Sequence, residues 1–442
     1  MNTLKSLNLG VRGWLLLFYQ FVAFVAMSAF TNFPLNMLAD MYGGAQKISM
    51  LYTAGTLVAI VVQLILSAFV GRIKNIKALG NLLGIVSMVF ILMIMLLPPS
   101  MQTAWQICYF IVCLTAPMWA TFMVGILVGQ WFPTKKGTFM GIATLAFPII
   151  NGTMGAFAGA VFANGVPDVF GAFLPYYIIC LIGLLFGIFA IRDYPEQCGA
   201  YRDNNKDMTP EVAKAMMMEE VENKKTSVWK TGSTLTNRDF WLITIPMGAL
   251  LLCSVGFSTQ TSAIIGSYGA AMDPFGGFAG VMVLFMICGI IGSFVIGLID
   301  TAIGTKKAII LSCVLMLISG ILGMLHTAGG TVAAMVFLGI FTGAASNFTV
   351  SAAAQYWRRE DFSSVFGCVN PIANILQAAG PSIIAVMLIK GGVVSVFGLI
   401  AAFGVISIIL SLLFSPKHVK AVDDKKREKA GKVLDDALAG RK

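Results

Sequence analysis

Residues 78–97 read ALGNLLGIVSMVFILMIMLL, an uncharged and mostly apolar run long enough to cross a lipid bilayer. A transmembrane helix needs about 20 such residues, because each adds ~1.5 Å and the hydrocarbon core is ~30 Å thick. Similar runs recur on both sides of this one. The candidate spans are residues 13–37, 47–70, 78–97, 103–130, 137–163, 170–191, 239–267, 275–299, 307–327, 331–356, 362–388 and 392–414. The sequence therefore predicts an all-α membrane protein with twelve transmembrane helices.

The composition excludes an ordinary soluble protein. Hydrophobic residues make up 58% of the 442 residues and charged residues only 11%, whereas soluble domains carry about 25% charged residues.

The positive charges identify the cytoplasmic side. Of the 30 Lys and Arg residues, all but Lys47 and Lys390 fall on the same side of the predicted membrane as the N-terminus. Cytoplasmic loops carry such an excess, so both termini are expected in the cytoplasm. The net charge of +10 then reflects topology and contact with anionic lipid, and it does not indicate a nucleic-acid partner.

The chain divides into two similar halves. The polar stretch 192–238 separates residues 1–191 from residues 239–414, each with six spans, and residues 415–442 form a charged tail. Three sequence pairs match at an offset of 225–227 residues, among them Arg12-Gly-Trp14 with Arg238-Asp-Phe-Trp241 and Gln130-Trp-Phe132 with Gln355-Tyr-Trp357. Because six is even, the repeats are parallel, as in two pseudo-symmetric halves about an axis along the membrane normal.

These features resemble the major facilitator superfamily over residues ~12–415. The segment Gln130-Trp-Phe-Pro-Thr-Lys-Lys-Gly137 and the entry Asn237-Arg-Asp-Phe-Trp241 resemble its oxalate–formate and monocarboxylate branch. The chain departs from the family pattern in two places, and the second departure weakens a transfer of the substrate. The loop 71–77 lacks the Asp of the superfamily signature, and the chain has Gly292-Ser293 and Ala373-Asn374 near the places where that branch tends to carry basic residues.

The middle of every predicted span lacks Asp, Glu, Lys and Arg. Because charged side chains inside a membrane usually mark proton relays or counter-ions, their absence argues against a buried carboxylate as proton carrier and against a Lys or Arg clamp. Facilitated diffusion, exchange, and coupling through peripheral groups such as Asp40 or Asp273 remain open.

Uncharged groups must then recognise the solute. The resemblance implies that spans 1, 4, 7 and 10 line a cavity, with 5, 8 and 11 contributing. Asn370, Asn374 and Gln377 share one face of span 11 at i, i+4 and i+7. The cavity candidates are Gln20, Ser28, Asn32, Trp119, Asn151, Gln260, Asn347, Asn370, Asn374 and Gln377. The alternative is that the polar side chains bond neighbouring helices and that Trp119 only fills the packing.

Loop charges suggest two latches between the halves. The resemblance brings the loop between spans 2 and 3 to the start of span 11, and the loop between spans 8 and 9 to the start of span 5. We expect both latches to stabilise an outward-facing state; the alternative is that these charges only set topology. The paired residues are Arg72 and Lys74 against Glu360 and Asp361, and Asp300 against Lys135 and Lys136.

No enzyme chemistry is visible. The eight cysteines form no C-x-x-C pair, which predicts packing residues and no metal site. A phosphate-binding Gly-Lys-Ser/Thr motif is also missing, so we expect no cofactor and no direct use of ATP. The tail 417–442 is predicted to form a cytoplasmic helix near anionic lipid.

The sequence predicts alternating-access transport of a small organic solute, with a monocarboxylate-like anion preferred. Larger amphipathic molecules are the alternative substrate class, and a transporter-like sensor that moves nothing is the alternative from another class. Short loops suggest a multi-pass protein of a prokaryotic cytoplasmic membrane that functions as a monomer.

Overall fold

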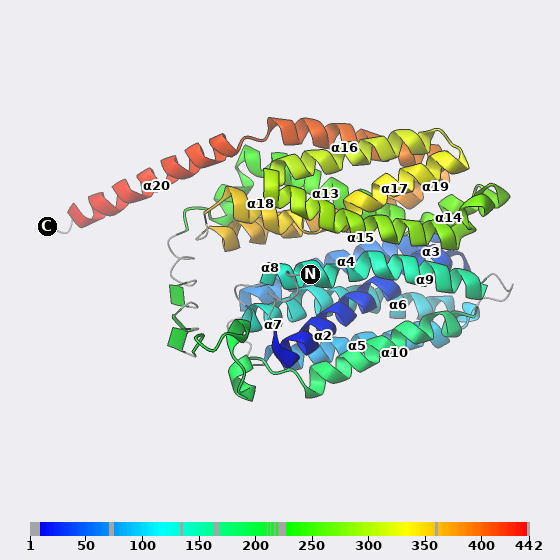
Figure 1. Cartoon of the computed structure of the whole chain (residues 1–442), viewed down its shortest axis with the longest axis horizontal. Coiled ribbons are helices and arrows are strands. Elements are labelled where there is room, and N and C mark those ends of the chain that lie inside the picture. Colours follow the sequence, from blue (N-terminus) through cyan, green and yellow to red (C-terminus); the bar gives the residue numbers. More distant parts are fainter. Residues whose placement is uncertain are drawn as a thin grey trace.

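The computed structural model describes residues 9–69, 75–132, 136–162, 168–209, 227–358 and 361–439, with isolated positions between 211 and 219. The described residues form helices and turns without strands. Figure 1 shows two groups of helices lying side by side, one from each half of the chain. The prediction of an all-α bundle in two halves is confirmed.

Six crossings make up the first half. Two of them are built from an α-helix, a π-helical segment and a second α-helix. The elements are α2 (Gly10–Met27), η1 (Ser28–Asn32) and α3 (Phe33–Met37); α4 (Ala45–Phe69); α5 (Ile76–Leu96); α6 (Gln102–Pro117), η5 (Met118–Met123) and α7 (Val124–Trp131); α8 (Lys136–Thr144) and α9 (Ala146–Phe162); and α10 (Val169–Phe189).

The second half follows the same order, and a tail helix comes after it. Its elements are α12 (Thr231–Leu235), α13 (Arg238–Ser258), α14 (Thr261–Gly266), α15 (Gly277–Ile303), α16 (Thr305–Met324), α17 (Ala328–Ala345), α18 (Phe348–Tyr356), α19 (Phe362–Leu413) and α20 (Pro416–Ala439). We call the end of the bundle where residues 192–238 join the halves the linker end, and the opposite end the distal end.

Helix α19 contains two crossings. Among the described residues, eleven helices are long and apolar enough to span a membrane. At ~1.5 Å per residue, the 52 residues of α19 would measure ~78 Å, more than twice the hydrocarbon thickness. The backbone leaves the helical region at Gly392, where φ is 66°. The break separates predicted spans 362–388 and 392–414, so the chain has the twelve predicted crossings.

The helix interruptions repeat between the halves. The π-helical segment η1 lies in span 1, and its counterpart in span 7 is the break at 259–260 between α13 and α14. The segment η5 lies in span 4, and its counterpart in span 10 is the break at 346–347 between α17 and α18. These pairs lie near the offset of the sequence repeat. Such interruptions often mark functional sites, because they leave backbone groups without helical partners.

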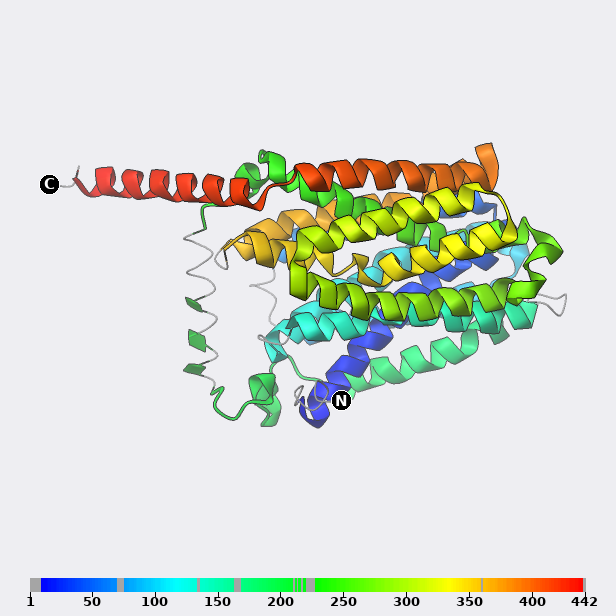
Figure 2. The same cartoon turned by 45° about the horizontal axis from the view of Figure 1, so that its top comes forward.

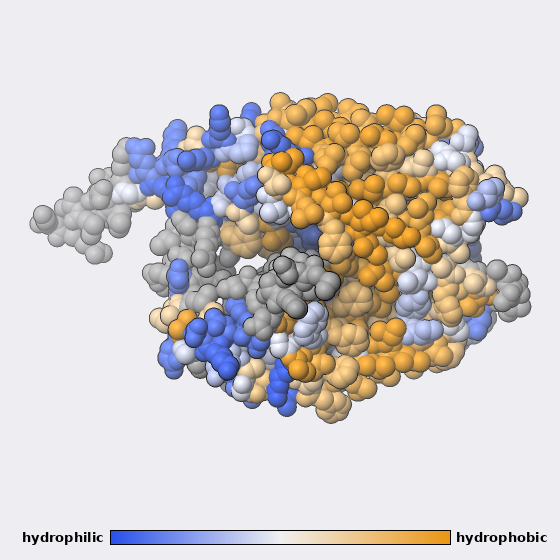
Figure 3. Space-filling view, in the orientation of Figure 1, coloured by the Kyte–Doolittle hydropathy of each residue, from blue (hydrophilic) through white to orange (hydrophobic). Residues whose placement is uncertain are grey.

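Each half encloses its own apolar core. Trp105, Trp119 and Phe173 are buried in the first half, and Phe257 and Phe341 in the second. Figure 3 shows a broad apolar band across the face in view, with polar side chains gathered toward both ends of the bundle. This surface suits a lipid environment.

The tail is helical, as predicted, but it does not lie along the apolar band. Figures 1 and 2 show α20 extending away from the linker end, roughly along the direction of the bundle helices. Polar contacts hold its first turns against the second half, as described below.

Candidate solute pathway between the two halves

The two halves meet along two helix pairs, α9 with α15 and α4 with α19. Glycines of α9 make the first contact close. A Cβ atom added at Gly152 would lie 2.2 Å from Cβ of Met286, and one added at Gly155 would lie 2.8 Å from Cβ of Met282. Small residues at such crossings allow helix backbones to approach each other in membranes. The seam therefore depends on glycine on one side and methionine on the other.

At the distal end, uncharged hydrogen bonds join the halves. Nδ2–H of Asn36 donates to the carbonyl of Ser258, and Oδ1 of Asn36 accepts from the N–H of Ser262 at 3.1 Å. Nε2–H of Gln260 donates to Oγ of Ser49 at 3.2 Å. Gln260 is only 2% exposed, so the structure places this predicted cavity residue inside a contact between the halves.

Helix α19 adds bonds of the same kind. The hydroxyl of Thr53 in α4 donates to the carbonyl of Ala378 at 2.7 Å and lies 2.7 Å from the hydroxyl of Ser382. The hydroxyl of Ser382 donates to the carbonyl of Ser49 at 3.0 Å. Sequence reasoning missed Asn36, Ser49, Thr53 and Ser382. In the sequence, each is a polar residue toward the end of an apolar span. Many transmembrane helices have polar residues there, so this feature does not identify a contact.

Three buried acidic residues lie at the linker end. In the described contacts, none of them bonds across to the other half. Asp193 accepts the N–H of Lys77 at 2.7 Å. Asp239 accepts the N–H of Ser415 and contacts His418. Asp361 is bonded by residues of the second half, described below. The hydrogen bonds between the halves described above thus lie at and near the distal end, as expected for a bundle closed there.

The contacts of neighbouring positions on α19 give the direction of the amide stripe, which consists of Asn370, Asn374 and Gln377. At 100° per residue, Leu376 and Gly380 point toward α13, where they meet Gly248 and Gly256. Ser382 points toward α4 of the other half. The stripe lies between these two directions, about 110° from each. Ile375 is 44% exposed and points within about 20° of the direction of Ser382.

The stripe retains hydrogen-bonding capacity. Asn370, Asn374 and Gln377 are half-buried, and Oδ1 of Asn370 accepts from the hydroxyl of Thr349 at 3.3 Å. This bond uses the amide oxygen of Asn370, and the Nδ2–H donors of the same amide take no part in it. Asn347 is half-buried at the break between α17 and α18. Spans 10 and 11 thus both contribute amide side chains to the candidate pathway.

The first half contributes buried polar groups. Gln20, Ser28 and Asn32 of span 1 are at most 4% exposed. Asn151 is 2% exposed and lies beside the glycines that meet α15. Its Nδ2 and the hydroxyl of Ser28 have no hydrogen-bond partner among the described residues. Leaving such donors unbonded is costly, so these positions suit a bound solute or water.

Trp119 does not face the space between the halves. It is fully buried, and its Nε1–H donates to the hydroxyl of Tyr19 at 2.9 Å. Tyr19 in turn donates to Oδ1 of Asn81 at 2.9 Å. The three residues come from α2, η5 and α5 of the first half, so Trp119 packs within that half in this conformation.

The predicted latches are described only in part. Arg72, Lys74, Lys135 and Glu360 lie outside the described residues, as does the side chain of Lys136. Oδ1 of Asp300 accepts from the hydroxyl of Thr305 at 2.6 Å, within its own half. Since the latches concern a state closed at the linker end, they remain predictions.

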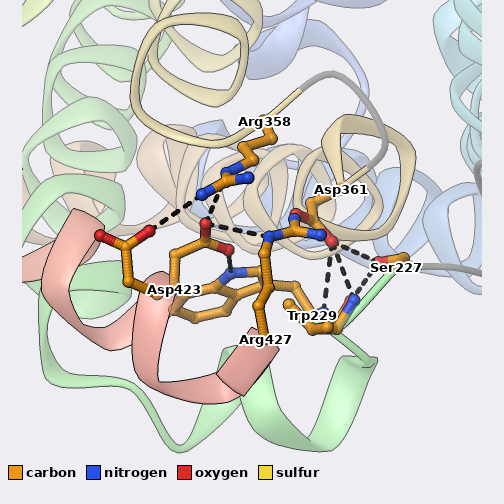
Figure 4. Close-up of polar contacts among 8 residues, drawn as sticks. Ser227, Trp229, Arg358, Asp361, Asp423 and Arg427 are labelled. Atoms are coloured by element: carbon orange, nitrogen blue, oxygen red, sulfur yellow. Dashed lines mark hydrogen bonds and ion pairs between the residues drawn. The ribbon is translucent and has the colours of Figure 1, made fainter. Parts of the chain in front are cut away.

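Asp361 is the centre of a buried acidic cluster that Figure 4 shows. One of its oxygens accepts from the hydroxyl of Ser227 at 2.7 Å and from the N–H of Val228 at 3.0 Å, and the other pairs with Arg427 of α20. Asp361 is fully buried. In this conformation it joins the linker to the tail, and the described contacts do not include the first half.

A second carboxylate of the cluster comes from the tail helix. Asp423 accepts from Nε1–H of Trp229 at 2.9 Å and pairs with Arg358 at 2.8 Å and with Arg427 at 3.1 Å (Figure 4). Nζ of Lys426 lies 3.7 Å from the Trp229 ring centroid. Burial lowers the pKa of the Lys426 ammonium, and the carboxylates of Asp361 and Asp423 oppose that shift. The cluster fixes the last part of the linker and the first turns of α20 on the second half.

Comparison with known proteins agrees with this architecture. Residues 250–440 match the family model of the Major Facilitator Superfamily. No curated protein matches the sequence. Among solved structures, the chain is similar to a POT family transporter in complex with 5-aminolevulinic acid, with a TM-score of 0.62 and 14% identity over 92% of this chain and 96% of that one. The chain is a multi-pass membrane protein with the major facilitator fold.

Proposed function

We propose that this protein is a secondary transporter that moves a small organic solute, a monocarboxylate-like anion, by alternating access. The observation that supports the proposal most is the stripe of Asn370, Asn374 and Gln377 on one face of α19, a helix that packs against α13 and against α4 of the other half. Amide N–H groups donate to a carboxylate without a full positive charge, and amide oxygens bind the polar groups of the rest of the solute.

The absence of ionisable side chains from the middle of the spans supports exchange or facilitated diffusion over proton coupling through a buried carboxylate. We place both termini in the cytoplasm, because the positive charges gather at the linker end. The short loops favour a prokaryotic cytoplasmic membrane. The resemblance to the oxalate–formate and monocarboxylate branch supports the choice of substrate class.

Counterflow in proteoliposomes tests the proposal. Vesicles are loaded with one unlabelled acid from a panel that includes formate, lactate, oxalate and 5-aminolevulinic acid, and uptake of the labelled acid is followed with and without a pH gradient. We expect gradient-independent exchange of at least one monocarboxylate. Transport of amphipathic drug-like compounds alone would favour the other substrate class. Binding without flux for every compound would favour a sensor.

Variants of α19 test the site. Replacing Asn374 with Ala removes a donor and an acceptor from the pathway, so KM should rise about tenfold, as expected for the loss of ~1.4 kcal/mol of binding. Ile375→Ala is the matched control, because its side chain is exposed on the same turn and lies about 100° around the helix from Asn374. Equal effects of both substitutions would place the solute elsewhere.

A further inference from the structure

The first break in the second half of the bundle is bridged by a side chain from the first half. Helix α13 ends at Ser258 and α14 begins at Thr261, so the terminal carbonyls of one and the first N–H groups of the other lack partners within a helix. Asn36 bonds one group of each kind, the carbonyl of Ser258 and the N–H of Ser262.

The chemistry of asparagine suits this position. Its planar amide carries a donor and an acceptor side by side, as a peptide group does, and can therefore replace the missing backbone partner on both sides of the break. Aspartate lacks the donor, and leucine, of similar volume, lacks both groups. Helix α3, which carries Asn36, packs against α14 at the distal end (Figure 1).

The bridge lies at the entrance to the pathway. A cavity of about 230 Å³ at the distal end is lined by Asn36, Gln260, Asp40 and apolar side chains such as Leu388. A solute arriving from the distal side would meet Asn36 and Gln260 before reaching the amide stripe. Separation of the halves at this end must break both bonds of Asn36.

We propose that Asn36 is the latch of the distal end: its amide bridges the break in span 7 and holds the bundle in the conformation closed there. The bond between Gln260 and Ser49 supports the latch from the neighbouring residue. The latch is uncharged, so its strength does not depend on salt as an ion pair would. Together the two bonds shift the balance between closed and open states roughly tenfold or more.

The test measures the conformation and does not require transport. Spin labels at Gln46→Cys and Ser267→Cys, exposed positions on opposite halves, report the distal separation in lipid nanodiscs. A Cys198→Ser background removes a partly accessible native thiol, because the other described cysteines are buried. We expect Asn36→Leu to lower the ratio of short to long distances at least about fivefold while the unfolding temperature stays near that of the parent.

Two further variants complete the test. Asn36→Asp keeps the volume and the acceptor but places a carboxylate against the carbonyl of Ser258, so it should also favour the long distances. Gln102→Leu is the control, because Gln102 is an exposed distal amide that bonds the carbonyl of Met41 within its own half. If Asn36→Leu and Asn36→Asp both give the distance distribution of Gln102→Leu, Asn36 is not the latch, and the proposed transport function remains untouched.

Discussion

Gly152 is the residue on which the seam between α9 and α15 depends most directly. An added Cβ would lie 2.2 Å from Cβ of Met286, closer than packed atoms allow, so one of the helices must shift. We expect Gly152→Ala to destabilise the protein by about 1–3 kcal/mol, the usual cost of overpacking, and to slow counterflow. Thermal unfolding in detergent and the counterflow assay measure the two effects.

Two variants separate overpacking from a general glycine effect. Gly125 lies in α7, where an added Cβ would meet nothing within 4 Å, so Gly125→Ala should leave stability equal or slightly higher. Combining Gly152→Ala with Met286→Ala should recover part of the loss, because the second change removes the atoms that clash. Without such recovery, the close contact does not explain the effect of Gly152→Ala.

Asp423 and Asp424 are neighbours that should differ strongly. The side chain of Asp423 is 8% exposed and bonds two arginines and the indole of Trp229, whereas that of Asp424 is 54% exposed and pairs with Arg358. Asp423→Ala should cost about 2 kcal/mol or more, since it leaves partly buried donors unpaired. Asp424→Ala should cost less than about 1 kcal/mol. The unfolding temperatures of the two variants measure this difference. Equal unfolding temperatures would contradict the stabilising role of the cluster.

At the scale of helices, the π-helical segment η1 makes a specific prediction. A π segment contains one residue more than the α-helix it interrupts, so deleting Ala29 should convert Ser28–Asn32 to regular helix with the flanking register preserved. The hydroxyl of Tyr109 donates to the carbonyl of Thr31 at 2.6 Å, and this bond depends on the interruption. We expect the deletion variant to fold, as judged by circular dichroism, and to lose most counterflow activity. Normal counterflow would show that the interruption is not needed for cycling.

The repeated interruptions explain why the spans could be located from sequence while their internal breaks could not. Hydropathy is averaged over a whole span, and the residues of η1 and η5 would fit a regular helix. The break at Gly392 is of another kind: it lies between two predicted spans, and its positive φ favours glycine. A backbone break follows from which neighbours bond the freed groups, and those neighbours are distant in sequence.

At the scale of the whole molecule, the twelve crossings and the two halves followed from sequence because they rest on composition and order. The stripe of Asn370, Asn374 and Gln377 also followed, because the helical period alone places the three on one face. The partners of Asp361 could not be predicted from the sequence. Several basic residues of the linker end could satisfy one carboxylate, and only the packing of α20 selects Arg427. The bridge from Asn36 to Ser258 joins residues 222 positions apart, a distance over which sequence pattern carries no information on contacts.

The orientation of the whole molecule yields the last prediction. Cys198 is half-buried at the linker end, whereas the other described cysteines are buried. The excess of Lys and Arg at that end predicts that it faces the cytoplasm. A membrane-impermeant maleimide should therefore label Cys198 in inside-out vesicles and leave it unlabelled in right-side-out vesicles. Ser100→Cys, exposed at the distal end, should show the opposite pattern in a Cys198→Ser background. Because the two thiols lie at opposite ends of one bundle, labelling of both from the same side would contradict the twelve-crossing arrangement itself. An exchange of the two patterns would contradict only the orientation, and would then require the latch of Asn36 to close the bundle toward the cytoplasm.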